Sequence, residues 1–428
     1  MLGLITCGSV AFQACSSDSG KSSAGNEAGA AGETGTGAAQ NGQAGSPGEA
    51  GAIGAGGESG GGGFVFPDAL DPISVVVPGA EPAKWTQLLV SGTDFVTTKK
   101  TQVVNVTLAP ALVSAATILA DSDVTLASSA GLGFAIEHTN DKVDLFDGAK
   151  VKTSFDLTDP GTPDAAPVTN KAYVSLLNQS LIAILDLDAG KVSSRIDLSE
   201  FNDPSDSDHS ADVGQGVYDA KKKVVYYSLA RIDRNAIAAD PAFHLPCSQE
   251  TGLIVGIDTT TDSVVDLNGP AAGKGIELSL VSQSSIALSA DGKSLVVLSA
   301  GCYEGATLKN QGVEVVDLEA GTTQAVYTPK GDDYLAKLIV TSGTDAVLGT
   351  FDSNFAGHWY KLDLSAGTLG DELMDVPGGV SFDGKDLLGV GTGGAIVRYT
   401  IATGAVANVS DASVGADYSS AYSTALVQ

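Results

Sequence analysis

Basic residues are scarce in this sequence of 428 residues, which has 23 Lys and Arg against 51 Asp and Glu. The formal net charge is −28, and a chain this acidic repels the phosphates of nucleic acids and the headgroups of anionic lipids. We therefore expect no nucleic-acid partner. The negative charge suits solubility outside the cytoplasm or the binding of cations.

The sequence also lacks the short motifs that identify common enzymes. No Gly-x-Ser-x-Gly elbow, Walker loop or dinucleotide fingerprint occurs in the strand-to-helix setting that each requires, and no Cys-x-x-Cys-His haem site is present. The four histidines show no spacing of the His-Glu-x-x-His kind. Beyond the first residues, no apolar run is long enough to span a bilayer. These absences favour a binding protein over an enzyme.

The N-terminus is short and apolar, and a cysteine follows it. Leu2–Ala14 leads into Cys15, within the run Phe12-Gln-Ala-Cys-Ser-Ser-Asp18. This pattern resembles a bacterial lipoprotein signal, although Phe12 stands where leucine is usual and no basic residue precedes the apolar run. The resemblance implies lipidation of Cys15 and an anchor in the outer membrane, facing the periplasm or the cell surface. An ordinary secretory signal, which would release the protein, is the alternative.

Residues 16–63 form a low-complexity segment built almost wholly from Gly, Ala, Ser, Glu and Gln. Such a segment buries too little apolar surface to offset the entropy lost on ordering, so we predict a disordered linker. Its root-mean-square reach is roughly 40 Å by square-root scaling. The sequence therefore divides into a signal-like segment at 1–15, a linker at 16–63 and a folded domain at 64–428.

The folded domain is organised around the stretch Ser284–Thr328, which reads as one complete four-stranded sheet. Apolar strands at 285–289, 294–300, 312–318 and 322–328 are separated by turn residues. The turn at Asp291-Gly292 tolerates the positive φ that hairpins need. Related units recur along the chain, and helical periodicity is absent over any useful length. The body is therefore predicted to be all-β and repetitive.

Counting the related units gives seven repeats. They fall at about 85–120, 121–157, 165–198, 210–268, 279–328, 333–375 and 378–410. Small four-stranded sheets at this spacing are typical of a β-propeller, because a closed ring buries the faces that a lone sheet exposes. We predict a seven-bladed β-propeller, with the tail strand Tyr422–Val427 completing the ring against the first repeat. A stacked β-solenoid is the structural alternative.

The repeats also carry a recognisable consensus. Ser-x-Asp-Gly-Lys-x-Leu-x-Val, followed by Val-x-Val-x-Asp-Leu-x-x-Gly, resembles the YVTN-type repeats of bacterial surface and periplasmic propellers. The resemblance covers most of 121–410, although the namesake Tyr-Val-Thr-Asn is absent and Tyr173-Val-Ser175 is the nearest approach. Related seven-bladed folds include lactonases and redox-enzyme domains, so the resemblance implies a fold and assigns no reaction.

The longest insertions are expected on one face of the ring, where the second-to-third-strand loops and the links between blades emerge. They are Ala230–Thr251, Ser199–Gly214 and Gly301–Gln311, and loops of this length are often functional. The histidines all map to this face, which makes them candidate ligand-binding residues. These histidines are His138, His209, His244 and His358.

Acidic residues on the same face suggest a cation site. Asp203, Asp206 and Asp208 partly resemble the Asp-x-Asp-x-Asp loop that binds calcium, so a divalent cation is a candidate cofactor. Pro204 interrupts that pattern, and a solvated acidic loop is the alternative.

The arginines and cysteines of the long loops offer further predictions. Arg231 and Arg234 could clamp an anion, or they could pair with carboxylates of the neighbouring acidic loop. Glu137, adjacent to His138, forms with Arg231 the one catalytic trio that the sequence offers. Cys247 and Cys302 fall in loops of neighbouring blades, and in an exported chain they favour a disulfide.

Together these features predict an exported, lipid-anchored β-propeller that binds a protein, a polymer or a small ligand such as a metal chelate at its loop-rich face, and that acts as a monomer. A propeller-type hydrolase resembling a lactonase, or a redox enzyme, is one alternative. A structural envelope protein without a small ligand is the other.

Overall fold

The computed structural model describes residues 70–428, apart from short gaps. The gaps are 95–97, 109–110, 115, 122, 163–167, 241–243, 248–250, 269–272, 306, 332, 353–356, 375–378, 392–394 and 414–419. Cys15 and the predicted signal and linker segments lie outside the described residues, so what the sequence suggests for them stays a prediction.

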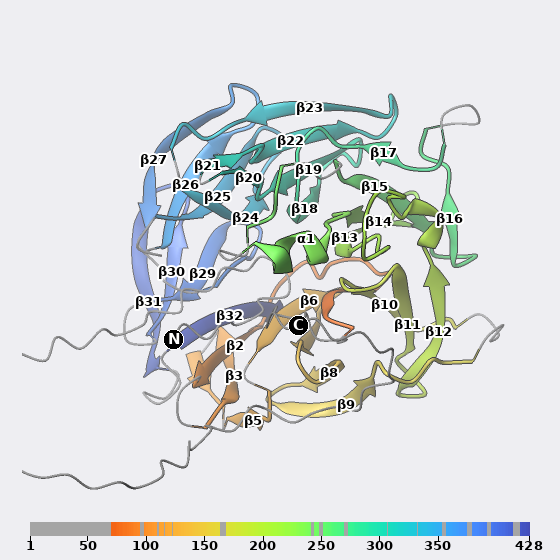
Figure 1. Ribbon diagram of the computed structural model, residues 1–428. Coiled ribbons are helices and arrows are strands. Elements are labelled where there is room, and N and C mark those ends of the chain that lie inside the picture. Colours follow the sequence, from red (N-terminus) through yellow and green to blue (C-terminus); the bar gives the residue numbers. More distant parts are fainter. Residues whose placement is uncertain are drawn as a thin grey trace, which may run out of the picture. The chain divides into compact units, whose positions relative to one another are not determined.

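Seven antiparallel sheets follow one another around a ring, and each contains a path of four strands (Figure 1). We number these sheets blades 1–7 in the order of the seven sequence repeats. The innermost strands contact one another from blade to blade, as β13 does with β18 and β18 with β24. The chain is a seven-bladed β-propeller. The fold prediction is thus confirmed, and the solenoid is excluded.

Blades 1–3 each contain a path of four strands, ordered from the innermost strand outward. Blade 1 contains β32 (Ser420–Val427), β2 (Gln87–Asp94), β3 (Lys100–Leu108) and β4 (Ala111–Val113), with β5 (Thr117–Leu119) also paired to β3. Blade 2 contains β6 (Val124–Ser129), β7 (Leu132–Glu137), β8 (Lys142–Asp147) and β9 (Lys150–Asp156). Blade 3 contains β1 (Pro72–Val76), β10 (Lys171–Leu176), β11 (Leu181–Asp186) and β12 (Lys191–Asp197).

The remaining blades follow in chain order. Blade 4 contains β13 (Val213–Asp219), β14 (Val224–Leu229), β15 (Leu253–Asp258) and β16 (Ser263–Val265), with β17 (Ile276–Glu277) also paired to β15. Blade 5 contains β18 (Gln283–Leu288), β19 (Ser294–Ser299), β22 (Gly312–Asp317) and β23 (Thr322–Tyr327). Blade 6 contains β24 (Tyr334–Val340), β25 (Asp345–Phe351), β26 (Gly357–Asp363) and β27 (Thr368–Met374). Blade 7 contains β28 (Val380–Phe382), β29 (Asp386–Val390), β30 (Ala395–Thr400) and β31 (Ala405–Ser413).

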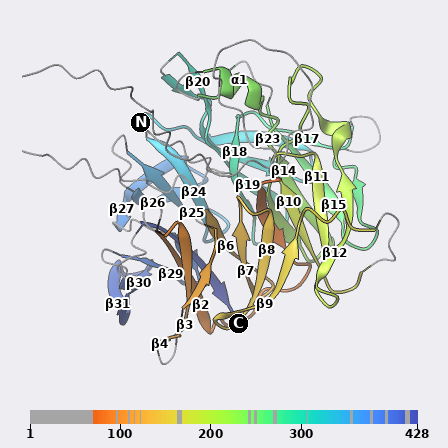
Figure 2. The same ribbon diagram turned by 60° about the horizontal axis from the view of Figure 1, so that its bottom comes forward.

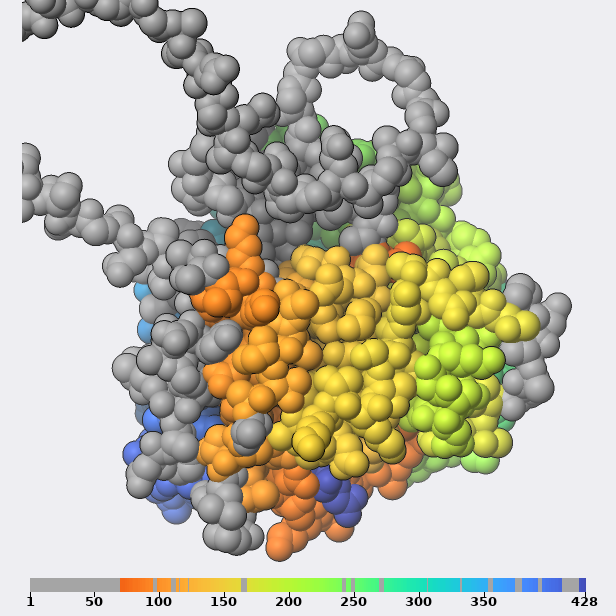
Figure 3. All heavy atoms as spheres, turned by 90° about the horizontal axis from the view of Figure 1, so that it is seen from below, coloured from red at the N-terminus to blue at the C-terminus, as the bar shows by residue number. Residues whose placement is uncertain are grey.

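Both ends of the described chain supply an innermost strand to a blade formed mainly by other residues. β32 pairs with β2 in blade 1, where Val427 lies opposite Gln87, so the predicted closure by the C-terminal strand is confirmed. β1 pairs with β10 in blade 3, where Val76 lies opposite Tyr173. Figure 3 shows the C-terminal residues, in dark blue, among the orange residues of the early strands.

The segment between β1 and β2 crosses blade 2, because β1 belongs to blade 3 and β2 to blade 1. The Val77 N–H donates a hydrogen bond to Ser129 Oγ at the end of β6, at 2.8 Å. Blade 2 therefore lies between blade 1, which β32 completes, and blade 3, which β1 completes. The third repeat contributes only three strands of its own, which the sequence pattern did not reveal.

The core lies between the faces of neighbouring blades. One buried cluster joins Phe134 of β7 to Leu176 of β10 and so packs blade 2 against blade 3. Another joins Tyr173 of β10 to Tyr227 of β14 across blades 3 and 4. Because each apolar sheet face is covered by the next blade, the hydrophobic stabilisation depends on the closed ring.

The repeated Asp-Leu-x-x-Gly words are the turns between third and fourth strands. In blade 5, Asp317 Oδ1 accepts hydrogen bonds from the N–H groups of Glu319 and Ala320, at 2.8 and 2.9 Å. Gly321 then adopts φ of +64°, which a side chain would disfavour. The consensus that resembles YVTN-type repeats therefore reflects the residues that this turn needs, and it does not identify a ligand.

Two small elements project from blades 4 and 5. The loop from β14 to β15 contains α1 (Arg234–Ala239), and the connection from β19 to β22 contains the hairpin of β20 (Cys302–Glu304) and β21 (Thr307–Lys309). Figure 2 shows α1 and β20 close together at one end of the ring. A short 3-10 helix, η1 (Ser199–Phe201), opens the acidic link to β13. In the described residues, no helix has the length and apolar character needed to cross a membrane.

Candidate functional site

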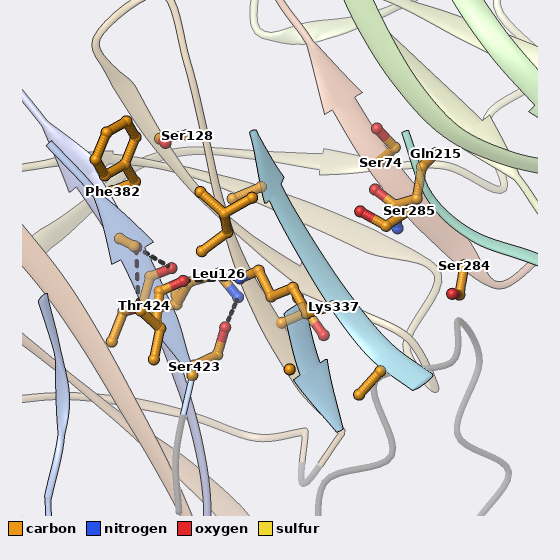
Figure 4. A pocket seen from close by; sticks show the side chains of 18 of the residues that line it. Ser74, Leu126, Ser128, Gln215, Ser284, Ser285, Lys337, Phe382, Ser423 and Thr424 are labelled. Carbon is orange, nitrogen blue, oxygen red and sulfur yellow. Dashed lines mark hydrogen bonds between the residues drawn. The ribbon is translucent and has the colours of Figure 1, made fainter. Parts of the chain in front are cut away.

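A cavity of about 420 Å³ lies at the centre of the ring (Figure 4). The innermost strand of each of the seven blades contributes to its wall, together with a few residues of second and third strands. The wall mixes serine and threonine hydroxyls with apolar side chains such as Trp85 and Phe382. The volume and the mixed lining are typical of a small-molecule site.

β-Bulges shape the wall of this cavity. The innermost strands β1, β13, β18, β24 and β32 each slip register against the second strand of their blade. A bulge re-aims the side chain that follows it, and all five residues that follow these bulges line the cavity. These five residues are Ser74, Gly216, Ser285, Lys337 and Ser423.

Hydrogen bonds that involve the post-bulge residues link several pairs of neighbouring blades. The N–H of Gly216 donates to Ser74 Oγ at 3.1 Å, which joins blades 3 and 4. The N–H of Leu126 donates to Ser423 Oγ at 3.0 Å, which joins blades 1 and 2. Ser285 Oγ donates to the blade 6 backbone at 3.4 Å. A serine hydroxyl is therefore sufficient for this structural role.

Lys337 occupies the equivalent position in blade 6. Its Nζ donates to the backbone oxygen of Val380 in blade 7 at 3.0 Å, and the side chain is exposed to the cavity. Among the described residues that line the cavity, Lys337 is the only charged or titratable side chain. The surrounding blades reduce solvation by bulk water, and this desolvation lowers the pKa of Lys337 to about 8. The described wall of the cavity thus contains one cationic side chain and no carboxylate.

Two further hydroxyls on the cavity wall have no hydrogen-bond partner among the described residues. They are Ser284 Oγ, within the β18 bulge, and Thr350 Oγ1, in the second strand of blade 6. Thr350 is only 3% exposed, so water does not readily satisfy its hydroxyl. A buried polar atom without a partner costs free energy, and because both oxygens have almost no exposed surface, a ligand in the cavity reaches them only after a change of side-chain rotamer. Figure 4 shows Lys337 between Ser423 on one side and Ser284 on the other.

The cavity lies toward the loop-rich end of the ring. Gln283, at the start of β18, pairs with Ser299, at the end of β19, and the β20–β21 hairpin leaves blade 5 just beyond this point. Ser284 and Ser285 therefore lie near the end that carries the hairpin and α1.

Three carboxylates lie close together at the acidic loop. The predicted Asp206 and Asp208 belong to this group, but its third member is Asp233 and not the predicted Asp203. Oxygens of Asp206, Asp208 and Asp233 lie within 4.8 Å of one another. Asp203 Oδ1 instead accepts hydrogen bonds from the N–H and hydroxyl of Ser205. Burial and the neighbouring Asp208 charge raise the pKa of Asp206 to about 6. Asp233 caps α1 by accepting from Ala236, so the loop geometry also has a purely structural explanation. A divalent cation here stays a prediction.

His138 is a buried structural residue at the end of β7. Its Nδ1 lies 2.9 Å from Asp71 Oδ1, and its Nε2 lies 3.0 Å from Thr125 Oγ1. Burial alone would lower the pKa of His138, but the hydrogen bond to Asp71 and the nearby Asp123 charge outweigh burial and raise it. His138 therefore ties the segment before β1 to blade 2.

The other three histidines lie in separate blades and loops. The ring of His244 stacks on Tyr303 with the ring centroids 3.9 Å apart. His358, in β26, pairs with Glu372 at 2.7 Å. His209 lies in the link from β12 to β13 with φ of +56°. Within the described ranges, no histidine belongs to a group of three potential metal ligands. Among the described residues, the histidines therefore do not form a shared metal site, and a role for any of them in binding another ligand stays a prediction.

Arg234 follows the second of the two roles predicted for the arginines. Arg234 is 8% exposed and contacts the carboxylates of Asp208 and Asp212, and its guanidinium also donates to Leu177 O at 2.7 Å. It holds the long loop against blade 3 and is not available as an anion clamp. Arg231 donates to Thr251 O at 3.3 Å within its own loop.

Glu137, the third member of the predicted catalytic trio, is also engaged elsewhere. It accepts hydrogen bonds from Asn140 and Lys142, at 2.7 and 3.2 Å.

Cys247 and Cys302 form the predicted disulfide. Their Cα atoms lie 4.9 Å apart, and the Cys247 N–H donates to Tyr303 O in the β20 strand at 3.2 Å. The bond joins the long loop of blade 4 to the hairpin of blade 5. Both projecting elements are thereby held as one unit.

The buried acidic groups of blade 2 predict that the stability of the protein falls as pH rises from 5 to 8. Burial raises the pKa values of Asp123 and Asp144 to about 6, so the folded state holds their protons more tightly than the unfolded chain does. Their contribution is fully present below about pH 4 and is lost as pH rises through 6. The raised pKa of His138 acts in the same direction, since its contribution is present below about 6.5 and lost above it. We expect a midpoint of thermal unfolding several degrees lower at pH 8 than at pH 5.

Differential scanning fluorimetry across this pH range tests the expectation. Asp123→Asn removes one titrating group while preserving its shape, so its midpoint should depend less steeply on pH. A midpoint that rises between pH 5 and pH 8 in the unmodified protein would contradict the assignment.

Comparison with known proteins assigns no function to the chain. No family model matches the chain, and no curated protein sequence matches it. Similar solved structures include a putative 6-phosphogluconolactonase from Bacteroides uniformis, with TM-score 0.49, 13% identity, and coverage of 80% of this chain and 99% of that one. Hydrazine synthase from Kuenenia stuttgartiensis gives TM-score 0.46, 12% identity, and coverage of 83% and 100%. A chain of a nidogen–laminin complex gives TM-score 0.41 and 12% identity, with coverage of 80% of this chain and 99% of that one.

These structures differ widely in function and resemble the chain too distantly to transfer one. The family name suggested by the repeats is therefore not established, whereas the propeller fold is.

Sequence reasoning missed Lys337, Ser284 and Thr350, the residues with unused hydrogen-bonding capacity on the cavity wall. A signal did exist, because Lys337 interrupts an otherwise apolar run, Leu335–Val340, in a chain with few basic residues. Aligning the blades by their bulges, which requires the structure, reveals that a lysine stands where other blades have serine or glycine.

Proposed function

We propose that this protein is an exported, envelope-associated binding protein that holds a small polar ligand in the central cavity of its propeller. The observation that carries the proposal is the cavity of about 420 Å³ with unpartnered hydroxyls from Ser284 and Thr350. In this proposal the ligand lies beneath the loop-rich face, and the disulfide-joined elements border its access. The binding-protein interpretation is preferred over catalysis because the predicted trio of Glu137, His138 and Arg231 is occupied with structural contacts.

The proposed location rests on two further observations. A disulfide between Cys247 and Cys302 suits an oxidising compartment outside the cytoplasm. The pattern around Cys15 fits attachment to a membrane by a lipid, with the 16–63 linker as a tether. Metabolic labelling with a tagged fatty acid tests this part, and labelling that persists in Cys15→Ser would contradict it.

Ligand binding is tested by thermal-shift measurements on the purified chain, followed by calorimetry. The panel contains small organic acids, sugars, lactones, inorganic phosphate and divalent metals. A ligand present at one hundred times its dissociation constant stabilises the folded state by about 2.7 kcal/mol. We expect stabilisation by at least one compound, with the compound recovered chemically unchanged.

A cavity-filling variant provides the control. Ser128 lines the cavity and has an exposed side chain, so Ser128→Phe fills part of the space without displacing a buried group. This variant should fold normally and lose the thermal shift. Stabilisation that survives in Ser128→Phe would place the ligand elsewhere, and no shift from any compound would favour a protein partner or a structural role.

A further inference from the structure

We infer that the ligand of the central cavity is a small monoanionic carboxylate that also bears hydroxyl groups, and that Lys337 is its counter-charge. This inference rests on the proposed function, since it names the ligand class of the same cavity. It follows from the composition of the wall, from the position of Lys337 in the repeat, and from the unpartnered hydroxyls.

The charge of the wall is the first argument. The chain as a whole has a net charge of −28, yet the described lining of the cavity contains one cation and no acidic side chain. An ammonium group with a carbonyl oxygen as its partner retains its positive charge without compensation. A bound anion supplies that compensation, and a single cation matches a single negative charge better than it matches a phosphate dianion.

The position of Lys337 in the repeat is the second argument. Ser74, Ser285 and Ser423 occupy equivalent post-bulge positions and link neighbouring blades through their hydroxyls. A lysine is not required for that link, so the structural role of Lys337 in contacting Val380 does not explain its charge. The bulge at Leu335–Lys337 instead directs an ammonium group into a cavity lined by hydroxyls.

The unpartnered hydroxyls supply the third argument and define the rest of the ligand. Ser284 Oγ and Thr350 Oγ1 have no partner in the described part of the chain, and each can donate one hydrogen bond and accept others. The nearby Gln215 adds an amide to the lining. A ligand with hydroxyl groups satisfies these atoms once their side chains rotate toward the cavity, whereas an apolar acid would leave them without partners.

The test compares matched charged and neutral ligands on the full chain by calorimetry. The pairs are glucuronate with glucose and lactate with lactamide, and inorganic phosphate is the third anion. We expect a carboxylate to bind at least tenfold more tightly than its neutral counterpart. Because Lys337 is the only titratable group of the described lining, carboxylate affinity should fall about tenfold between pH 7 and pH 9.

Lys337→Ser is the decisive variant, because serine already occupies the equivalent position in three other blades. It should fold with a similar unfolding midpoint, lose at least tenfold in carboxylate affinity and lose the pH dependence. Lys337→Arg should retain much of the affinity. Lys361→Ser is the matched control, since Lys361 lies in the same blade and pairs with Asp345 at the surface, so its loss changes the net charge equally.

The outcomes separate this inference from the proposed function. Equal affinity for charged and neutral ligands, abolished by Ser128→Phe but unchanged in Lys337→Ser, would overturn the anion inference and leave the cavity as the binding site. Preferential binding of phosphate would also overturn it. If no compound binds, or if Ser128→Phe has no effect on binding, both the inference and the proposed function fail.

Discussion

Deletion of the last nine residues, Ser420–Gln428, is expected to abolish the cooperative thermal unfolding transition of the propeller. These residues contain β32, the innermost strand of blade 1, and they bury Ala425, Leu426 and Val427 against two core clusters. Replacing one buried leucine by alanine typically costs 2–5 kcal/mol, and loss of the strand also leaves the edge of β2 unpaired. The total is comparable with the whole stability of a typical domain, about 5–15 kcal/mol.

Calorimetry and near-ultraviolet circular dichroism measure this loss. A chain that lacks residues 1–69 is the matched control, because it retains every strand described here and should unfold cooperatively. A synthetic peptide of residues 420–428, added in excess, should restore part of the transition by pairing with β2. A truncated chain that unfolds with an unchanged midpoint would show that closure by β32 is dispensable.

Loss of the disulfide is expected to destabilise the protein by roughly 4 kcal/mol. Cys247 and Cys302 are separated by 55 residues, and cross-linking a loop of this length restricts the unfolded chain by about that amount in the loop-entropy model. Cys302 is also fully buried, beside Val281 and Leu245, so opening the bond disturbs local packing as well. Chemical unfolding of the oxidised and reduced protein gives the difference directly.

The variant Cys247→Ser/Cys302→Ser separates the bond from other effects of the reducing agent. It should resemble the reduced protein, and adding reductant should not change its stability further. If reduction lowers the stability of this variant too, the effect does not come from the disulfide. Equal stability of the oxidised and reduced forms would mean that the two loops are held by their remaining contacts alone.

The repeats made most of the fold predictable from sequence. The same kind of turn recurs between strands, as at Asp317 and Gly321. Because local hydrogen bonds form this turn, its residue types recur in the sequence and can be recognised there. The place of β1 in blade 3 could not be predicted in this way, because Pro72–Val76 is a short apolar strand whose partner, β10, begins almost a hundred residues later. Its pairing depends on the ring as a whole and not on local sequence.

The site was less predictable than the fold. Sequence reasoning favoured histidines and arginines on the loop-rich face, but burial and local carboxylates engage His138 and Arg234 in structural contacts. Lys337 was overlooked because strand alternation alone does not show where a bulge turns a side chain. The chemical character of the cavity arises from seven strands that are distant in sequence, so no single stretch contains it.

The pairing of β32 with β2 also sets the order in which the protein can be completed during synthesis. Ser91 and Ser423, which are hydrogen-bonded across this pair, are 332 residues apart, so blade 1 lacks its inner strand until the ribosome has translated β32. Contacts between such distant residues slow folding. A nascent chain therefore cannot close its ring before β32 has been made, and a product that stops before β32 exposes the edge of β2 to aggregation or to proteolysis.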